Sequence, residues 1–308
     1  MYSPVDTQDE VDPVLVVAPE TFLIERHPSV MNARAVVVSV PHYGIGSPRR
    51  YTADEFSTHL GHHLAFGFQD AFAPHLYGAL HEQGARLVAT QLSRLFVDLN
   101  RPRDDFERNG DHVHSRSGVL RTHTRRGTPI FTTAPTAHEA ALWLQHFYDP
   151  YYAALEHALE RCIGRHQHAV LLDVHTASGQ RMGKHQIVLG TSRRRTAAPA
   201  LVQALQELFS RHGFKCDVDV PGYVGGNIVR TFGAHVREAT DAIQIEVSAG
   251  LLQTLPNDEF VRAQIDGSRP APDATTLARL RACIAEMLVL SDAYARERGN
   301  PGVTDMVT

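Results

Sequence analysis

The chain has 308 residues and a hydrophobic content of 43%, which suffices to bury one large core without support from disulfides or repeats. Its formal net charge is −4, and it has no long block of Lys and Arg. This composition excludes the strong electrostatic attraction that draws basic proteins to nucleic acids and anionic membranes. We therefore expect a small-molecule or protein partner.

The cysteines and the N-terminal segment indicate where the protein resides. Cys162, Cys216 and Cys283 are widely spaced and form no CxxC pair, which fits a reducing compartment. Residues 1–13 are acidic and lack the basic and apolar regions of a secretory signal. The longest apolar stretch, residues 35–40, is far shorter than the roughly 20 residues of a membrane span. We predict a soluble, cytoplasmic protein.

The first third of the chain predicts four strands and one helix. Short β-branched runs predict strands at residues 14–17 and 34–40. Apolar residues at three- and four-residue spacing predict a helix at residues 70–83. Two further apolar runs predict strands at residues 85–90 and 95–99.

The middle of the chain begins with a long polar segment. Residues 100–129 are rich in Arg, Asp, His, Gly and Thr without periodicity, which predicts a loop, and long loops in compact domains are often functional. Residues 136–166 have helical spacing that is interrupted near Asp149-Pro150. The run HAVLLDV at residues 168–174 predicts a buried strand.

The rest of the chain continues the alternation of strands and helices. We expect a strand at residues 186–190, a helix at 197–212, a glycine-rich turn at 225–226, a strand at 242–247 and a closing helix at 273–296. This order predicts an α/β fold with a mixed, largely parallel sheet sandwiched by helices in one catalytic domain over residues 1–308. Active sites in such sheets gather at the carboxyl ends of strands.

Three acid or imidazole side chains occupy the ends of separate predicted strands. His42 and His175 each follow a strand, and Glu246 lies on the polar face of an apolar one. A buried carboxylate needs a charged partner or a catalytic task, so a structural ion pair is the alternative for Glu246. Asp173 precedes His175 by two residues and points to the same side of the strand, where it can orient the imidazole. For both histidines, a structural role is the alternative to metal binding.

Two groups of residues suit the binding of anions. Asn100 and Arg101 follow the run LFVDL and pair an amide with a guanidinium, which suits recognition of a carboxylate. A salt bridge between Arg101 and a neighbouring Asp is the alternative. Arg230 follows the glycines at residues 225–226 and offers a second guanidinium beside a flexible backbone.

Five segments of the chain resemble, in order, the motifs of the N-formylglutamate amidohydrolase family. That family shows PHSG, RYVVDLNR, DxHS, GGxxxRxxG and IQLE. The corresponding segments here are VSVPHYGIGSP (38–48), SRLFVDLNRPRDD (93–105), LLDVHTASG (171–179), GGNIVRTFG (225–233) and DAIQIEVS (241–248). The resemblance covers residues 35–255. Because the family is similar to zinc carboxypeptidases and aspartoacylase-type acylases, it implies a zinc carboxypeptidase-like, three-layer αβα fold.

The resemblance also implies roles for individual residues. His42 and His175 would ligate one zinc ion per chain, and Glu246 would be the general base. Asn100 and Arg101 would hold the carboxylate of the substrate.

The remaining ligands follow from less direct matches to the family. Carboxypeptidases place a Glu three residues after the first His, but this chain has Ile45 there. Asp70 matches an acidic residue that the family carries before the following helix, so it would be the third zinc ligand. Arg94 and Arg230 match family positions and would complete the anion site.

Two departures from the family pattern bear on the substrate. The chain has PHYG, with Tyr43, where the family has PHSG. The segment at residues 121–130 carries more charge than the common form, although a solvated basic loop is the alternative. Such changes bear on which acyl group or amino acid is accepted.

The implied residue types suit a hydrolytic reaction. Two histidines and a carboxylate leave a fourth zinc position open for water, whose pKa zinc lowers towards roughly 7. Glu246 would take the proton from this water and deliver it to the departing amine. The resemblance thus implies removal of an N-formyl or other small N-acyl group from an acidic amino acid, foremost N-formyl-L-glutamate, as in histidine degradation.

Two alternatives stay open. A carboxypeptidase-like enzyme or broader acylase would keep the zinc and cleave another bond. A metal-free binding module for anionic amino acids would use Arg101 and Arg230 without turnover.

Overall fold

The computed structural model describes residues 22–57, 67–124 and 126–300. The strand predicted at residues 14–17 lies outside the described residues. No helix in the described ranges is long and apolar enough to cross a membrane.

A seven-stranded sheet forms the centre of the molecule, with the strand order β1-β3-β2-β6-β9-β7-β8. Strands β3, β2, β6 and β9 are parallel, whereas β1 runs antiparallel to β3 and β7 runs antiparallel to β9. The strands are β1 (Leu23–Arg26), β2 (Val36–Val40), β3 (Arg86–Thr90), β6 (Ala169–Ala177), β7 (Ile187–Gly190), β8 (Cys216–Val218) and β9 (Thr240–Ser248). The predicted mixed, largely parallel sheet is therefore confirmed.

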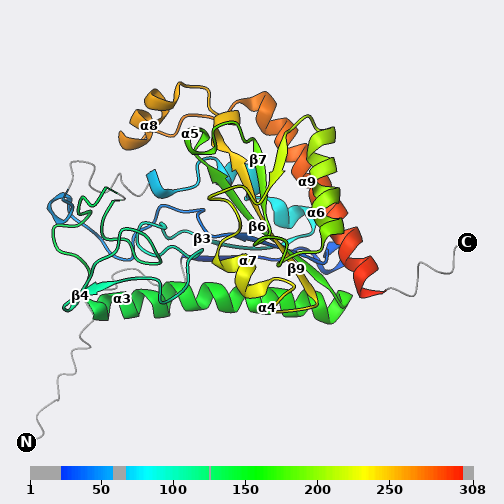
Figure 1. The fold of residues 1–308 in the computed structure, drawn as a ribbon, viewed down its shortest axis with the longest axis horizontal. Coiled ribbons are helices and arrows are strands. Elements are labelled where there is room, and N and C mark those ends of the chain that lie inside the picture. The colour runs from blue at the N-terminus through cyan, green and yellow to red at the C-terminus, as the bar shows by residue number, and fades with distance from the viewer. Residues whose placement is uncertain (1–21, 58–66, 125, 301–308) are drawn as a thin grey trace, which may run out of the picture.

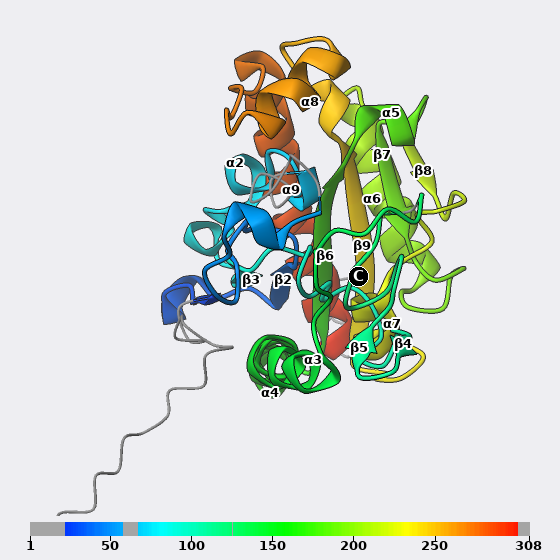
Figure 2. The ribbon, with the colours of Figure 1, turned by 90° about the vertical axis from the view of Figure 1, so that its left-hand side faces the viewer.

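Helices cover both faces of this sheet (Figures 1 and 2). Helices α6 (Pro199–Arg211) and α9 (Ala274–Gly299) pack on one face, and α4 (Asp149–His166) and α7 (Asn227–Phe232) pack on the other. The central strands are buried on both sides, which explains why they read as nearly continuous apolar runs. The expected layering of helices around a sheet is present.

Short helices complete the described chain. The remaining α-helices are α2 (Ala73–Tyr77), α3 (Ala137–Trp143), α5 (Gly179–Met182) and α8 (Asn257–Ile265). Short 3-10 helices lie at Val30–Asn32, Ala53–Glu55, Leu80–Gln83 and Ala249–Leu251. The long loop predicted at residues 100–129 is present and contains one small hairpin, formed by β4 (Arg108–Asn109) and β5 (His112–Val113).

The interruption expected near Asp149-Pro150 takes the form of a π-helical turn. Helix α3 continues through this turn, Leu144–Tyr148, into α4, which begins at Asp149. Pro150 lies in the first turn of α4, where proline is tolerated because its missing N–H has no partner within the helix.

Two predicted elements are wrong. The helix expected at residues 70–83 is divided into α2 and the 3-10 helix Leu80–Gln83, and Asp70 lies before both. Phe72 has a left-handed backbone, with φ of 66°, which sets the start of α2. The strand expected at residues 95–99 is a buried turn instead. Four of its five side chains are apolar and belong to the same core cluster as Val88 of β3, so the apolar run reflects burial and not pairing in the sheet.

Polar residues gather on the face of the sheet that α4 and α7 cover. Side chains alternate between faces along a strand, and on this face each of three neighbouring strands changes from apolar to polar towards its carboxyl end. The changes are from Val37 to Ser39 in β2, from Leu171 to Asp173 and His175 in β6, and from Ala242 to Gln244 and Glu246 in β9. A buried polar site is therefore built at this end of the sheet.

Candidate active site

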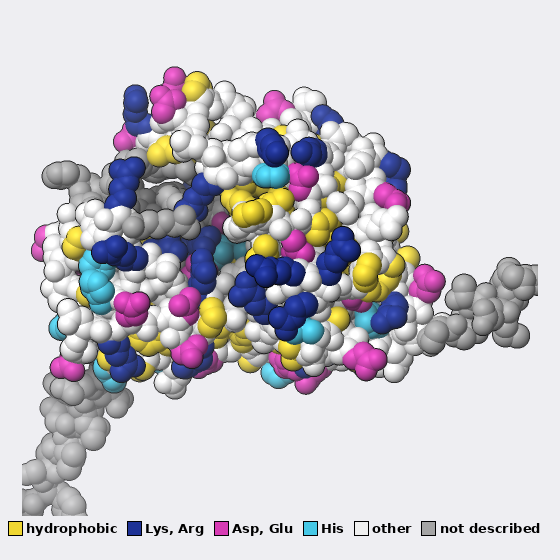
Figure 3. All heavy atoms as spheres, in the orientation of Figure 1, with side chains coloured by type: hydrophobic (Ala, Val, Ile, Leu, Met, Phe, Trp, Pro, Cys, Tyr) yellow, Lys and Arg dark blue, Asp and Glu magenta, His cyan; other side chains and the backbone are white. Residues whose placement is uncertain are grey.

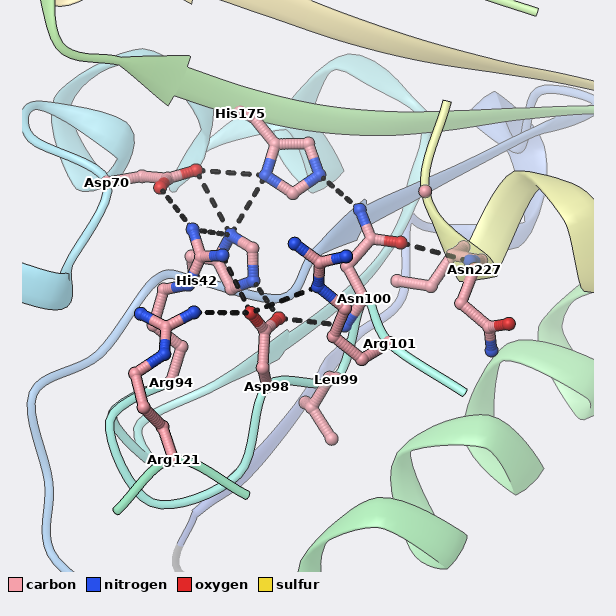
Figure 4. Close-up of polar contacts among 12 residues, drawn as sticks. His42, Asp70, Arg94, Asp98, Leu99, Asn100, Arg101, Arg121, His175 and Asn227 are labelled. Atoms are coloured by element: carbon pink, nitrogen blue, oxygen red, sulfur yellow. Dashed lines mark hydrogen bonds and ion pairs between the residues drawn. The ribbon is translucent and has the colours of Figure 1, made fainter. Parts of the chain in front are cut away.

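Three separate segments bring His42, Asp70 and His175 together. His42 follows β2, His175 lies within the adjacent strand β6, and Asp70 lies just before α2. His175 was expected just after its strand, but β6 extends two residues beyond it. One ligand atom from each of the three residues lies within 4.8 Å of the others, and all three side chains are buried. Figure 4 shows them pointing toward one another.

The geometry of these three residues fits a metal ion. Asp70 Oδ2 lies 2.9 Å from His175 Nδ1 and 3.5 Å from His42 Nδ1, and the two Nδ1 atoms are 3.0 Å apart. Two lone pairs at this separation repel each other unless a proton or a cation lies next to them. Two imidazoles and a carboxylate are a donor set that zinc accepts.

Buried carboxylates orient both imidazole rings. His42 Nε2 lies 2.8 Å from Asp98 Oδ1, and His175 Nε2 lies 3.1 Å from Asp173 Oδ2. With Nε2 protonated and donating to these carboxylates, each ring directs the lone pair of Nδ1 towards Asp70. Such carboxylate–histidine pairs hold metal-binding rings in one tautomer and orientation.

The charges of the cluster reinforce one another. Burial alone would raise the pKa of Asp70, but the neighbouring His42 and His175 hold it well below its usual value. Burial alone would lower the pKa of His175, yet the carboxylates of Asp173 and Glu246 raise it well above 6.5. Two backbone hydrogen bonds also hold Asp70 in position. Its own N–H donates to the His42 carbonyl, and the Thr176 N–H donates to Asp70 Oδ2.

Glu246 lies beside this cluster. It is the direct neighbour of His175 in the register of β6 and β9, and it is 8% exposed. Gln244 Nε2 donates to Glu246 Oε1 at 2.7 Å. Burial raises the pKa of the Glu246 carboxyl to about 7, and the negative charge of Asp70 adds to this effect. A carboxyl group with such a pKa can both accept and release a proton near neutral pH.

Asn100 is engaged mainly within the protein. Its Nδ2 donates to Asp173 Oδ2 at 2.9 Å, and its Oδ1 accepts from the backbone N–H of Ile228 at 3.0 Å. The amide therefore connects β6 to α7 and leaves one lone pair of Oδ1 for another donor. Asp173 Oδ1 also accepts from Ser39 Oγ. These hydrogen bonds hold the Asp173 carboxylate in place beside the His175 ring.

The three expected arginines lie at different distances from the cluster. Arg94 is closest, with Nη1 3.2 Å from His42 Nδ1 and 3.7 Å from Asp70 Oδ1. The Arg101 side chain is 41% exposed, with Nε 3.9 Å from Asp98 Oδ2. Arg230 is exposed on α7 and donates from Nη2 to the Gly225 carbonyl, so the structure does not join it to the central cluster.

The site as described consists of two imidazoles and a carboxylate that could hold a metal ion, next to the buried carboxyl group of Glu246, with Arg94 and Arg101 nearby. A model of the N-formylglutamate amidohydrolase family matches residues 34–252. The chain belongs to this family. The resemblance that the five motifs indicated is thus confirmed.

Curated relatives of this chain carry the name of the family's activity. An N-formylglutamate deformylase of Pseudomonas putida is 28% identical over 186 residues, which are 58% of this chain and 68% of the relative. A second one, from Pseudomonas aeruginosa, is 28% identical over 238 residues, or 74% of this chain and 83% of the relative. All residues that the sequence analysis assigned to the site lie within the range matched by the family model.

Solved structures share the fold. The N-formylglutamate amidohydrolase of Ralstonia eutropha JMP134 superimposes with a TM-score of 0.72 at 21% identity, covering 92% of this chain and all of that one (100%). A gene product of Agrobacterium tumefaciens gives a TM-score of 0.62 at 14% identity, covering 89% and 95%. At these identities the likeness concerns the fold alone.

The sequence analysis did not single out Asp98 or Arg121. Asp98 is 1% exposed and receives Arg94 Nη2 at 2.7 Å, and Arg121 Nη2 lies 3.9 Å from it (Figure 4). Burial alone would raise the pKa of Asp98, but Arg94 and His42 hold it well below its usual value. Its position two residues before Asn100, within the family motif VDLNR, was the signal that could have identified it. Arg121 lies in the long loop, and its sequence gives no such signal.

Proposed function

We propose that this member of the N-formylglutamate amidohydrolase family is a metal-dependent enzyme that hydrolyses N-formyl-L-glutamate to formate and glutamate. The observation that carries the proposal is the convergence of His42, Asp70 and His175 beside the buried carboxyl group of Glu246. The names of the two Pseudomonas relatives support the choice of substrate. The predicted place in amino-acid catabolism, such as histidine degradation in the cytoplasm, belongs to the same proposal.

His42, Asp70 and His175 would hold the metal, and zinc is the ion that best suits two imidazoles and one carboxylate. When bound, such an ion supplies a Lewis acid that lowers the pKa of water and polarises a carbonyl group. Asp98 and Asp173 would keep the two rings in the tautomer that this requires, because a carboxylate oxygen of each lies within hydrogen-bond distance of Nε2 of one ring.

Glu246 would move the proton. Its Oε1 accepts from Gln244, which leaves Oε2 to accept the proton of the attacking water. The carboxyl group then passes this proton to the amide nitrogen, so that glutamate departs with a neutral amine. With a pKa of about 7, the carboxyl group can both accept and release a proton at neutral pH.

The guanidinium groups would recognise the acidic side of the substrate. Arg101 is partly exposed at the edge of the cluster, and Arg94 lies next to His42 and Asp70. A planar guanidinium binds a carboxylate through two parallel hydrogen bonds. Asn100 is left with one Oδ1 lone pair for the substrate, so the charge recognition falls to Arg101 and Arg94, with Arg230 further out.

Metal analysis combined with a formate-release assay tests this function. We expect one zinc per chain and chelator-sensitive release of formate from N-formyl-L-glutamate. N-formyl-L-norleucine, which lacks the side-chain carboxylate, should be a poor substrate. Turnover of N-acetyl-L-glutamate or of a peptide in preference to N-formyl-L-glutamate would favour the acylase or carboxypeptidase alternative. Protein without stoichiometric metal or turnover would favour the binding module.

A further inference from the structure

Three consecutive arginines form an unusual turn between β7 and α6. We call Arg193, Arg194 and Arg195 the arginine turn. Ser192, Arg193 and Arg194 all have left-handed backbones, with φ of 49°, 60° and 63°. Non-glycine residues rarely adopt this conformation, and consecutive ones are rarer still because each costs free energy. Backbone strain of this kind is typical of functional sites.

Neighbouring residues hold the turn in place. The Thr191 N–H and hydroxyl donate to the two carboxylate oxygens of Asp219 at 2.7 and 2.5 Å. The Arg194 N–H donates to Thr191 Oγ1 at 2.8 Å, and the Ser192 N–H donates to the Val224 carbonyl at 2.6 Å. The backbone of the turn is thus fixed by hydrogen bonds to Thr191 and to the loop between β8 and α7, while its side chains are exposed.

The side chains of the arginine turn are exposed and carry uncompensated charge. Within the described residues, none of the three forms an ion pair with a carboxylate. Arg230, on α7, is exposed as well. Figure 3 shows Lys and Arg side chains gathered on the face that α7 occupies in Figure 1. A rigid group of positive charges at the surface suits an anionic ligand.

The arginine turn lies near the candidate active site, because β7, which precedes the turn, pairs with β9, which carries Glu246. Gly190 at the end of β7 pairs with Gln244 of β9, and the Gly226 N–H donates to Gln244 Oε1 at 2.5 Å. Gln244 in turn donates to Glu246. From the spacing of residues along and between strands, the backbone of the turn lies within about 20 Å of the Glu246 backbone. An extended peptide of about six residues covers that distance.

We propose that the arginine turn binds the carboxylates of an acidic peptide whose N-formylated first residue occupies the active site. This inference rests on the proposed function, and it extends the substrate class from a single N-acyl acidic amino acid to N-acyl acidic oligopeptides. The first residue is held by Arg101 and Arg94, and acidic side chains further along the peptide contact the arginine turn.

The observations favour an acidic peptide over a nucleic acid. The three arginines project from one tight turn, whereas nucleic-acid grooves combine a long basic track with aromatic side chains that stack on bases. The whole chain has a net charge of −4, which opposes the general attraction that nucleic-acid binding needs. The candidate active site also carries guanidinium groups, those of Arg94 and Arg101, which suit carboxylates.

A binding measurement tests the arginine turn without using turnover. The probe is N-formyl-hexa-L-glutamate with a fluorescein-labelled lysine at its C-terminus, added to Glu246→Gln protein so that the probe stays intact. Replacing Arg193, Arg194 and Arg195 together by Gln should weaken binding at least tenfold. The matched control replaces Arg161, Arg262 and Arg298, which are exposed on α4, α8 and α9, and should change binding less than twofold.

Other outcomes of this measurement would overturn the proposal. Equal weakening by both triple variants would mean that net charge, and not the turn, attracts the probe. Equal affinity of the wild-type turn for N-formyl-hexa-L-glutamine would mean that carboxylates are not recognised. Tighter binding of a labelled twelve-residue oligothymidylate through the same arginines would assign the turn to nucleic acid.

An activity measurement separates this inference from the proposed function. In protein with an intact Glu246, the triple variant of the turn should keep the KM for N-formyl-L-glutamate within twofold and raise the KM for the hexapeptide at least tenfold. Absence of turnover with both substrates would contradict the proposed function. The binding measurement alone would then decide whether the arginine turn recognises acidic peptides. Equal changes in KM for both substrates would contradict the proposed role of the arginine turn and leave the proposed function intact.

Discussion

The Nδ1 atoms of His42 and His175 lie 3.0 Å apart, while each Nε2 lies next to a buried carboxylate on the opposite side of its ring. The two rings therefore present their lone pairs to one point, where Asp70 contributes a negative charge. Burial makes it costly to leave such a set without a cation. A bound cation would explain why the chain buries these two imidazoles together with three carboxylates, those of Asp70, Asp98 and Asp173.

Replacing Asp98 by Asn should weaken metal binding about 10- to 100-fold, because His42 loses the carboxylate that fixes its tautomer. Competition with a fluorescent zinc chelator measures this affinity. The control is Asp217→Asn, which removes a carboxylate that pairs with His185 outside the site. Unchanged affinity in Asp98→Asn would mean that this carboxylate serves the neighbouring arginines and not the metal site.

The His175→Ala variant should lose stoichiometric metal, since one of three ligands is removed and Asp70 loses its closest imidazole. Metal content after dialysis, together with the circular dichroism of the folded protein, checks this expectation. His185→Ala is the matched control and should retain the metal. A folded His175→Ala protein with a full complement of zinc would show that the ligands are other residues.

Glu246→Gln should retain the metal and lose turnover by about 10²- to 10⁴-fold, because an amide cannot accept and return a proton. The Gln side chain has the shape of the carboxylate and can still accept from Gln244. Formate release per zinc-loaded chain is the measurement. Activity close to that of the wild type would rule out Glu246 as the proton acceptor.

Arg101→Gln should raise the KM for N-formyl-L-glutamate by about tenfold or more while metal content stays unchanged, since one charge-assisted contact to the substrate is lost. Arg103→Gln is a nearby control, because Arg103 pairs with Asp149 at the surface. A drop in metal content in Arg101→Gln would instead indicate that its role is to hold Asp98.

The sequence predicted much of the fold because the central strands are buried on both faces. Such strands appear as apolar runs of four to eight residues, which single-sequence patterns detect well. The same rule failed at residues 95–99, which are apolar but form a buried turn, because burial and strand pairing leave the same trace in a sequence. The helix at residues 70–83 failed because a left-handed residue, Phe72, precedes a short α2.

Periodicity in the sequence located residues of the candidate site only where they lie on strands or directly after them. Asp173 and His175 share a strand face, so their neighbourhood follows from a spacing of two. Asp70 and Asp98 reach the cluster from turns, and no periodicity indicates where a turn directs its side chains. Asp70 was found through the resemblance to an acidic residue that the family carries before the following helix. Asp98 lies within the motif VDLNR, but its role became evident only from its contact with His42.

The stability of the metal-free protein should depend on pH through Glu246. Burial raises the folded-state pKa of this carboxyl group to about 7, whereas an unfolded chain has an ordinary Glu pKa of roughly 4.3. The folded state therefore binds the proton more tightly. The contribution of Glu246 to stability is fully present below about pH 4.3 and is lost as the pH rises towards 7.

Comparison with Glu246→Gln measures this contribution together with the effect of the Glu246 charge on His175, since the other titrating groups are common to both proteins. Between about pH 4.5 and 7.5, the free energy of unfolding of the metal-free wild type should fall relative to that of the variant by on the order of 3 kcal/mol. Urea unfolding in the presence of chelator measures both values, and Glu207→Gln, an exposed substitution on α6, controls for the loss of one carboxylate.

Saturating zinc should reduce the difference, because a cation beside Glu246 favours its ionised form. Parallel pH profiles for the wild type and Glu246→Gln would show that burial does not raise the pKa of Glu246 in the folded protein.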